Sequence, residues 1–422
     1  MRNLILITIV SALFLAACGR ADKPTVFFMV FGGPEELAAY ESLVDAFHAA
    51  QSDVLVELRY VPDPAEYRRR LAADFSAGAA PDVMLLNYRR FATFAGQGGL
   101  QPLGEYLADS DLLDEADFYT PVIDSFRFAD ELWCIPQNMS SLVVYYNQDL
   151  FDAAGLPYPA DNWTWNDFLT AAQRLTVDLD GNGRSDQYGA GIEPTLNRLA
   201  PFIWQAGGEL VDDPQNPTRL ALDSAAAQAG MQWFVNLQTE YGVVPDALAQ
   251  SAESSESRFL NGTLAMYFNS RRGVPTYRTI TNFTWDVAPL PRGSQQAGIL
   301  HSDGYCMAAT SKQKEAAWRF IEFANSMAGQ ELIARTGRTV PSLRAVAESP
   351  AFLEPSKSPS RSRVFLDTID TVRAVPVTAN WPIIEDTASQ DIEQAFLGQV
   401  SVAEAAETAV QRTMQYFDSG AR

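Results

Sequence analysis

The strongest constraint on the fold is an alternation of apolar runs and helical periods near the start of the chain. Residues 25–31 (Thr-Val-Phe-Phe-Met-Val-Phe) form a continuous apolar run, which is typical of a strand buried on both faces of a sheet. Residues 35–50 repeat apolar side chains at spacings of three and four, which predicts an amphipathic helix. A second strand (54–60), a second helix (65–76) and a third strand (82–86) follow. This order predicts a parallel sheet with helical crossovers, and therefore an α/β fold.

The length and composition suit two domains. The chain has 422 residues, of which 47% are hydrophobic and spread along the sequence, so it can bury more than one core. The serine- and proline-rich stretch 349–362 predicts an exposed loop that buries little. No segment after residue 17 approaches about eighteen consecutive apolar residues, so the sequence predicts no permanent membrane span.

The N-terminus has the layout of a secretory signal peptide. A short basic start at residues 1–3 precedes an apolar run at 4–15, which is too short for a permanent membrane span. Two alanines then precede Cys18, and Leu-Ala-Ala-Cys resembles the lipobox of bacterial lipoproteins. The resemblance implies removal of residues 1–17, acyl chains on Cys18 and a lipid-anchored linker at 18–23. The alternative is an ordinary signal peptide followed by an incidental cysteine.

The charge balance disfavours whole classes of partner. With 31 basic and 52 acidic residues the chain carries a formal net charge of −21, or −22 once Arg2 is removed with the leader. Nucleic acids and anionic membrane surfaces require positive charge, so neither is an expected partner. The motifs of phosphate loops, dinucleotide folds, nucleophile elbows and zinc proteases are absent, and only His48 and His301 could supply an imidazole. The sequence therefore predicts no catalytic centre and no required cofactor.

Two cysteines lie beyond the leader, Cys134 and Cys306. Each is in a short strand-like run, 132–135 and 304–307, and pairing between strands far apart in the sequence would bring them together. Export to an oxidising compartment permits a disulfide between them. Two buried free thiols are the alternative.

The sharpest local motif is a run of oxygen-bearing side chains. Asp178, Asp180, Asn182 and Asp186 occupy positions one, three, five and nine of a loop with glycine at position six, as at the start of a calcium loop. Position twelve, where a bidentate glutamate belongs, is Gly189. One interpretation is a structural Ca²⁺ site. The other is a tight turn closed by side-chain hydrogen bonds to its own backbone.

Tryptophans beside amides and carboxylates suggest a carbohydrate ligand. Trp163 and Trp381 lie in loop-like sequence, where an aromatic face could stack on a sugar ring while neighbouring polar groups bind its hydroxyls. Packing against the core is the alternative. Asn269, Arg271 and Arg272 follow an apolar strand and would emerge at its carboxyl end, where open α/β sheets bind ligands. A surface turn is the alternative there.

Together these features resemble the extracellular solute-binding proteins of ABC importers, specifically the carbohydrate-binding lipoproteins related to maltose-binding protein. The resemblance covers nearly the whole chain. Each marker is degenerate alone, and their order and spacing make the match specific. The markers are the lipobox, the strand ending at Gly32-Gly33, Ala80-Pro81-Asp82-Val83, Trp133-Cys134-Ile135-Pro136 with residues 144–151, and the segments 178–189, 259–268 and 304–324.

The resemblance implies two α/β lobes, each a mixed sheet flanked by helices, joined by crossing strands and closing over a solute by hinge motion. Residues 24–137 and 301–344 would form lobe one, and residues 138–300 and 345–422 lobe two. A monomeric binding protein would then pass the solute to a membrane permease. By position, the implied ligand-binding residues are Gly33, Glu35, Asn87, Asn138, Trp163, Trp204, Asn269, Arg271, Asp303 and Trp381.

The chain departs from the family pattern after the strand at 264–268. An aromatic-Gly pair often follows there, whereas this chain has Asn269-Ser270-Arg271-Arg272-Gly273. Two arginines near a cleft favour an acidic or phosphorylated sugar over a neutral one. An exported glycoside hydrolase, or a lipoprotein adaptor that senses a ligand without transport, is the competing function.

Overall fold

The first lobe is built on a mixed sheet that combines strands from two distant parts of the chain. The structure, a computed structural model, describes residues 23–418. Strands lie in the order β2-β1-β3-β14-β4, with β7 also paired to β14. β1 is parallel to β2 and β3, whereas β14 is antiparallel to β3, β4 and β7. The strands are β1 (Thr25–Phe31), β2 (Leu55–Val61), β3 (Val83–Asn87), β4 (Leu100–Gln101), β7 (Cys134–Pro136) and β14 (Asp303–Ala308).

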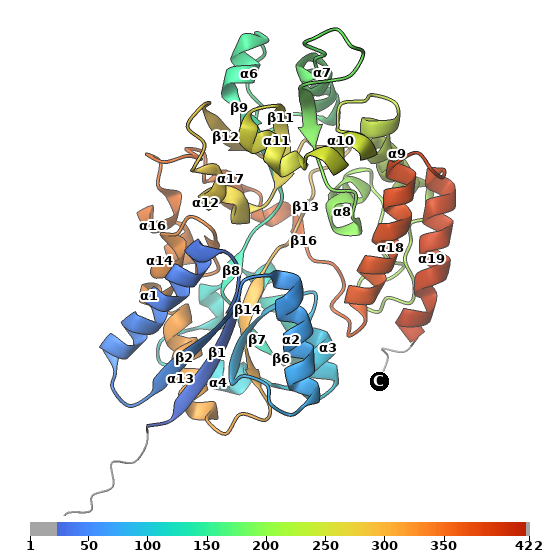
Figure 1. Cartoon of the computed structure of the whole chain (residues 1–422). Helices are drawn as coiled ribbons and strands as arrows, with labels where there is room; N and C mark the ends of the chain where they lie inside the picture. Colours follow the sequence, from blue (N-terminus) through green and yellow to red (C-terminus); the bar gives the residue numbers. More distant parts are fainter. Residues whose placement is uncertain (1–22, 419–422) are drawn as a thin grey trace, which may run out of the picture.

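Helices cover both faces of this sheet (Figure 1). α1 (Pro34–Ala50) packs against α13 (Lys314–Asn325) and α14 (Met327–Ala334), while α2 (Pro64–Ser76) packs on β1 and β2. Both α1 and α2 begin at a proline, which suits the first helical position because the N–H there has no intrahelical partner. The alternation of strand and helix predicted for this part of the chain is therefore confirmed.

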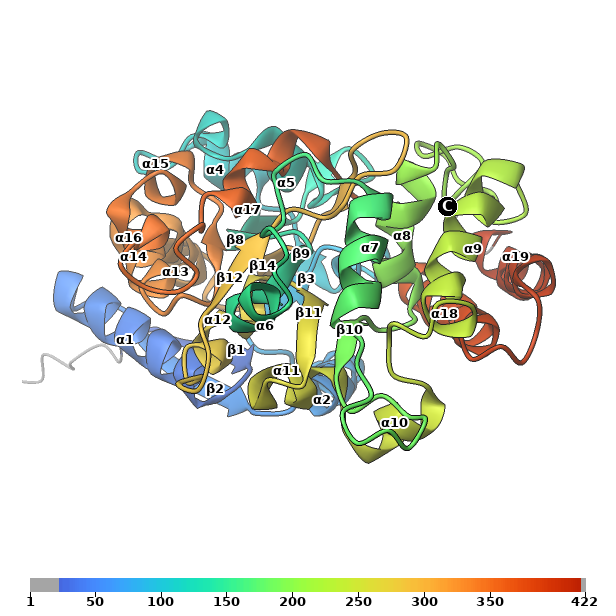
Figure 2. The same ribbon diagram turned by 90° about the horizontal axis from the view of Figure 1, so that it is seen from above.

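The second lobe has its own mixed sheet, in the order β10-β11-β9-β12. β10 and β11 are parallel, and β9 is antiparallel to both β11 and β12. Its strands are β9 (Val143–Asn147), β10 (Tyr188–Gly191), β11 (Leu264–Asn269) and β12 (Trp285–Ala288). Four long helices pack on one another at one end of the lobe, as Figure 2 shows from above. They are α8 (Leu196–Gln205), α9 (Ala225–Thr239), α18 (Trp381–Phe396) and α19 (Val402–Asp418).

The lobes are joined by short extended segments that lie side by side. β8 (Asn138–Met139) pairs with β15 (Val340–Pro341), and Ser140 bridges to His301. The Ser140 N–H donates to the His301 carbonyl over 2.7 Å, and the His301 N–H donates back over 2.9 Å. These crossings give the two-lobed architecture that the sequence predicted.

The stretch beyond the crossings differs from two sequence predictions. α15 (Arg344–Ala347) and α16 (Pro350–Leu353) pack against α14, so they lie with lobe one, although residues from 345 onward were predicted to belong to lobe two. The stretch 349–362, which was predicted to be an exposed loop, also buries side chains: Phe352 and Ser362 are almost fully enclosed. A serine- and proline-rich composition did not reveal that partner elements cover this stretch.

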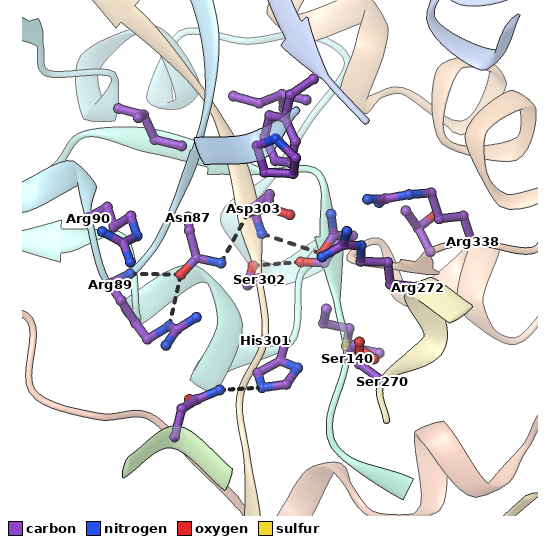
Figure 3. A pocket seen from close by; sticks show the side chains of 18 of the residues that line it. Asn87, Arg89, Arg90, Ser140, Ser270, Arg272, His301, Ser302, Asp303 and Arg338 are labelled. Atoms are coloured by element: carbon purple, nitrogen blue, oxygen red, sulfur yellow. Dashed lines mark hydrogen bonds between the residues drawn. The ribbon is translucent and has the colours of Figure 1, made fainter. Parts of the chain in front are cut away.

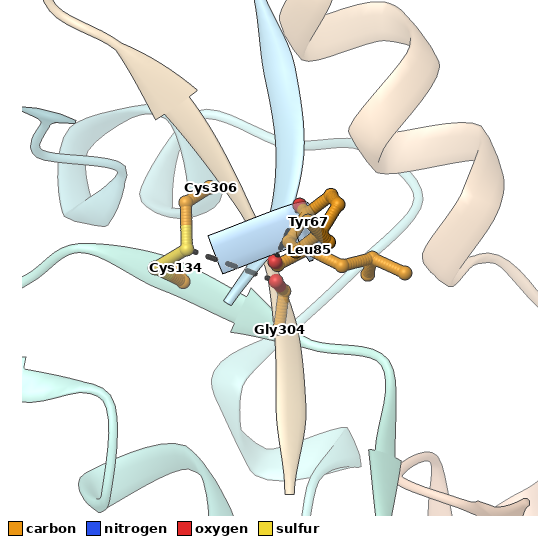
Figure 4. The surroundings of a disulfide bond; sticks show 5 residues. All are labelled: Tyr67, Leu85, Cys134, Gly304 and Cys306. Atoms are coloured by element: carbon orange, nitrogen blue, oxygen red, sulfur yellow. Dashed lines mark hydrogen bonds between the residues drawn. A yellow bond between two sulfur atoms is a disulfide. The ribbon is translucent and has the colours of Figure 1, made fainter. Parts of the chain in front are cut away.

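Cys134 and Cys306 form a disulfide (Figure 4). They are register partners on the antiparallel pair β7 and β14, and both side chains are fully buried. The bond links residues that are 172 positions apart in the sequence. Of the two interpretations of these cysteines, the structure shows the bridged form.

Candidate ligand-binding cleft

A cavity of about 260 Å³ lies between the two lobes (Figure 3). Lobe one contributes Phe31 at the end of β1 and Asn87 at the end of β3, and lobe two contributes residues of α8 and of the end of β11. The crossing segments supply residues 138–140 and 301–303. Open α/β sheets bind ligands beyond the carboxyl ends of their strands, so this cavity is the candidate ligand site.

Four of the predicted ligand-binding residues line this cavity: Asn87, Asn138, Asn269 and Asp303. The Asn87 amide donates to an Asp303 carboxylate oxygen over 3.1 Å, and the Asp303 N–H donates to Asn138 Oδ1 over 3.3 Å. The Asn269 amide donates to the Tyr277 hydroxyl over 2.6 Å. These contacts hold the amides and the carboxylate in place before any ligand arrives, which lowers the cost of binding.

Gly33 and Glu35, two more predicted residues, line an adjoining cavity of about 370 Å³. Gly32 just before them has φ +130°, and a Cβ there would lie 2.0 Å from the Glu36 carboxyl carbon. The glycine therefore leaves room for Glu36, which pairs with Arg338 at the cavity wall. The residues common to both cavities are Arg198, Asn269, Arg272 and Arg338.

Arg271 points away from both cavities, which contradicts its predicted role in binding. Its side chain is fully buried and donates to the Gly337 carbonyl over 2.7 Å and to the Ser362 hydroxyl over 2.9 Å. The guanidinium carbon also lies 4.7 Å from the centre of the Phe352 ring. Arg272, its neighbour, is exposed and lines both cavities. The tight turn after β11 directs the two consecutive side chains differently, so the arginine that faces the cavities is Arg272.

The three tryptophans predicted to stack on a sugar do not line the cleft cavity. Trp163 is 5% exposed and donates its indole N–H to a backbone carbonyl over 2.9 Å. Trp381 is fully buried at the start of α18. Trp204 is 2% exposed and lies beneath the Arg373 guanidinium, 4.7 Å from the ring centre, beside a different cavity. All three belong to the packing of lobe two, which corrects their predicted role.

The wall of the cleft cavity is strongly basic. Its arginines are Arg68, Arg89, Arg90, Arg198, Arg272 and Arg338. Three of them pair with glutamates of neighbouring elements: Arg89 with Glu385, Arg198 with Glu193, and Arg338 with Glu36. The other three form neither an ion pair nor a side-chain hydrogen bond with any residue that the structure describes. Figure 3 shows Arg89 and Arg90 on one side of the cavity and Arg272 and Arg338 on the other, with Asp303 between them.

His301, on a crossing segment, lies among these positive charges. Its Nε2 is 3.1 Å from the Asn197 amide nitrogen. Burial lowers the pKa of His301 well below its usual value, and the charges of Arg198, Arg89 and Arg272 lower it further. The ring is therefore neutral at pH 7 and adds no charge of its own to the cavity.

Sequence reasoning missed an aromatic pair and most of the arginines. The rings of Phe31 and Tyr67 lie 4.8 Å apart, and both line the cavity. Phe31 ends the first apolar strand and Arg89 lies two residues beyond Asn87, so the strand-end argument that selected Asn87 could have found both. Arg198 lies in the first turn of α8, where no local motif marks it as ligand-facing.

The fold and cleft agree with comparisons to known proteins. The model of the bacterial extracellular solute-binding protein family matches residues 32–331. The chain belongs to this family. It is 23% identical to the galactooligosaccharide-binding protein of Bacillus subtilis, over 81% of this chain and 80% of that protein. It is also 23% identical to the sn-glycerol-3-phosphate-binding periplasmic protein of Escherichia coli, over 96% and 95% respectively.

A solved structure shares the fold of this solute-binding protein. The ABC substrate-binding protein of Listeria monocytogenes in complex with cycloalternan superposes with a TM-score of 0.85. The match is 23% identical in sequence and covers 95% of this chain and all of that one. At this level of identity the comparison establishes the two-lobed architecture.

The acidic loop of this solute-binding protein gathers three carboxylates. One oxygen from each of Asp178, Asp180 and Asp186 lies within 4.8 Å of the others, and all three residues are exposed. The Gly183 and Gly181 N–H groups donate to Asp178 over 2.8 Å each, and these bonds lower the pKa of its carboxyl. The loop thus has the self-closed turn that was one of the two interpretations. A Ca²⁺ ion at these carboxylates stays a prediction.

The predicted signal peptide, residues 1–17, and the predicted lipidation site, Cys18, lie outside the described residues. Within residues 23–418, none of the helices combines the length and the apolar character needed to cross a bilayer.

Proposed function

We propose that this solute-binding protein captures a carbohydrate in the cleft between its lobes and delivers it unchanged to the permease of an ABC importer. The observation that carries the proposal is the composition of the cleft wall, which combines both lobes with the crossing segments. A ligand held by both lobes makes more contacts when they are closed than when they are apart. Its binding therefore shifts the population towards the closed form, which a permease can recognise.

The chemistry of the wall suits a hydroxyl-bearing ring. Asn87, Asn138 and Asp303 present amide donors and carbonyl or carboxylate acceptors, while the partly buried Phe31 supplies aromatic surface. Sugars need this combination because their hydroxyls hydrogen-bond and their C–H faces stack. Relatives named for galactooligosaccharide and glycerol phosphate binding support a ligand of this class.

We also propose that acyl chains on Cys18 tether the protein outside the cytoplasm and that it acts as a monomer. The lipobox resemblance supports the tether, and a tethered binding protein stays close to its permease. Mass spectrometry of the protein purified from membranes tests the first point, because an acylated N-terminal peptide beginning at Cys18 is expected. An unmodified cysteine would contradict the lipid anchor without affecting the proposed ligand.

A thermal-shift screen of the purified protein tests the binding function. The panel contains monosaccharides, oligosaccharides, uronic acids, sugar phosphates and polyols. A ligand at a thousandfold excess over Kd stabilises the folded state by about 4 kcal/mol. We expect Asp303→Ala to weaken the binding of any hit by about tenfold or more, since a hydrogen bond to a charged group is worth roughly 1.5–3 kcal/mol. Asp111→Ala, an exposed carboxylate outside the cleft, is the matched control.

Three results would contradict the proposal. No shift across the panel would remove the carbohydrate assignment. Chemical conversion of a bound sugar during incubation would favour the exported hydrolase. Binding without any effect of gene deletion on uptake of the labelled sugar would favour a sensor or adaptor that does not serve transport.

A further inference from the structure

The cleft cavity holds more positive charge than its own carboxylates match. Six arginines line it, whereas Asp303 is the one carboxylate among its described lining residues. Counting the three paired glutamates as well leaves two positive charges unmatched. The chain as a whole has 52 acidic and 31 basic residues, so this concentration of arginine opposes the overall composition. Such an excess inside a cleft attracts and holds anions.

Arg272 supplies positive charge on a side chain that a ligand in the cavity can reach. It is exposed, and its side chain forms no ion pair or hydrogen bond within the described chain. The adjoining cavity carries Glu35 and Glu256 together with the glutamates that neutralise Arg338 and Arg198. A negative group is therefore favoured in the first cavity and disfavoured in the adjoining one.

Two buried polar atoms of residues that line the same cavity as Arg272 lack a hydrogen-bond partner. Arg198 donates through Nε to Glu193 over 3.1 Å and through Nη2 to Asn269 over 3.4 Å, but its buried Nη1 has no hydrogen-bond acceptor. The adjacent Asn197 carbonyl oxygen is buried and has no donor. Buried polar groups are almost always paired in folded proteins, so an unpaired donor and an unpaired acceptor on residues of one cavity wall indicate that a bound molecule completes both.

We propose that the solute is an anionic carbohydrate, with a phosphate or carboxylate group seated against Arg198 Nη1 and the Arg272 guanidinium. A hydroxyl of the same molecule donates to Asn197 Oδ1. Guanidinium groups suit this task because their planar N–H donors match the oxygens of both anions. His301 is neutral and therefore accommodates the hydroxyl-bearing part of the ligand beside the anion. This inference rests on the proposed function and names the class of carbohydrate.

The test compares matched ligands by isothermal titration calorimetry. The probes are glucose, glucose 6-phosphate, glucuronate, sn-glycerol 3-phosphate and inorganic phosphate, each measured at low and high salt. We expect a phosphorylated or carboxylated probe to bind at least about tenfold more tightly than glucose, and its affinity to fall with added salt. Separate phosphate and carboxylate probes identify which anion the subsite takes, and inorganic phosphate separates the anion from the sugar.

Variants locate the effect. We expect Arg272→Gln to weaken binding of the anionic probe by about tenfold to a hundredfold, the range for losing one charged hydrogen-bond donor, and to weaken glucose binding much less. Asn197→Ala should weaken it less, because it removes a neutral acceptor. Arg70→Gln removes the same charge from an exposed position on α2 outside the cleft and is the control. Equal melting temperatures for the Arg272 variant and the unchanged protein would show that folding is intact.

The outcomes separate the inference from the function it rests on. Tight binding of a neutral sugar that is insensitive to salt and to Arg272→Gln would overturn the anionic ligand while leaving carbohydrate capture in place. Binding of inorganic phosphate as tight as that of every sugar phosphate would support the anion subsite but remove the carbohydrate. No binding by any probe would overturn both.

Discussion

Breaking the Cys134–Cys306 disulfide should destabilise the first lobe by an amount that depends on the state of the second. The bond closes a loop of 172 residues that contains every strand of the second sheet. When both lobes unfold, the chain-entropy relation for a loop of that size gives a loss of about 5 kcal/mol on reduction.

The loss is smaller when the second lobe stays folded. In that state the backbone hydrogen bonds between Ser140 and His301 already hold the two ends of the lobe together. The flexible loop then consists only of the segments from Cys134 to Ser140 and from His301 to Cys306. For a loop of about 13 residues the same relation gives about 3 kcal/mol. Reduction should therefore lower the free energy of opening the first lobe alone by about 3 kcal/mol.

Native-state hydrogen exchange of the oxidised and reduced protein measures this difference. A loss of about 3 kcal/mol should speed exchange of the β1 and β3 amides roughly a hundredfold, while the β9 and β11 amides keep their rates. Comparing the two redox states of one sequence is its own control, because no side chain is removed. Unchanged exchange in β1 and β3, with thiol labelling proving complete reduction, would refute the loop argument. An equal increase in both sheets would show that the lobes unfold only together.

Two single substitutions extend these tests. Burial raises the pKa of Asp212, but hydrogen bonds from Thr218 and the nearby backbone outweigh it and lower the pKa to about 2. A carboxyl whose pKa is lower in the folded state than in the unfolded state stabilises the fold at pH values above the unfolded pKa of about 4. Asp212→Asn should therefore lower the melting temperature at neutral pH. The difference in melting temperature between the variant and the unchanged protein should vanish as pH falls from about 4 towards 2. A constant difference in pH-dependent calorimetry would contradict this. Arg271→Ala should lower the unfolding free energy by about 2–5 kcal/mol in urea titrations, because a buried carbonyl and a buried hydroxyl lose their hydrogen-bond donor. The same substitution should change ligand affinity by less than about threefold. A loss of affinity equal to that of Arg272→Gln would show that Arg271 reaches the ligand.

The fold could be predicted from the sequence where its signals are local. The apolar run 25–31 coincides with β1, and the helix predicted at 35–50 begins only one residue earlier. A strand buried on both faces and a helix with one apolar face each leave a periodic pattern in consecutive residues. The order of these patterns was enough to indicate parallel crossovers, and the strand-end rule placed Asn87 and Asn269 at the cleft.

The site could be predicted less well because side-chain direction depends on distant residues. Arg271 and Arg272 are chemically identical neighbours, and it is Arg271 whose inward side chain meets the buried carbonyl of Gly337 and the hydroxyl of Ser362. Trp381 stands beside polar sequence, yet its ring is enclosed by lobe two. Arg198 approaches the cleft because α8 packs with α9 and α18, contacts that no local pattern encodes.

The position of β14 in the first sheet sets an order of events while the chain is being made. β14 lies between β3 and β4, but it is synthesised after every strand of the second sheet. Until then β3 keeps a free edge of unpaired backbone groups, and its side chains at 83–86 are entirely apolar. An edge of that kind pairs readily with other chains. The growing polypeptide therefore carries a finished second sheet beside an unfinished first one, and fragments that stop short of residue 303 should be the forms most prone to aggregate.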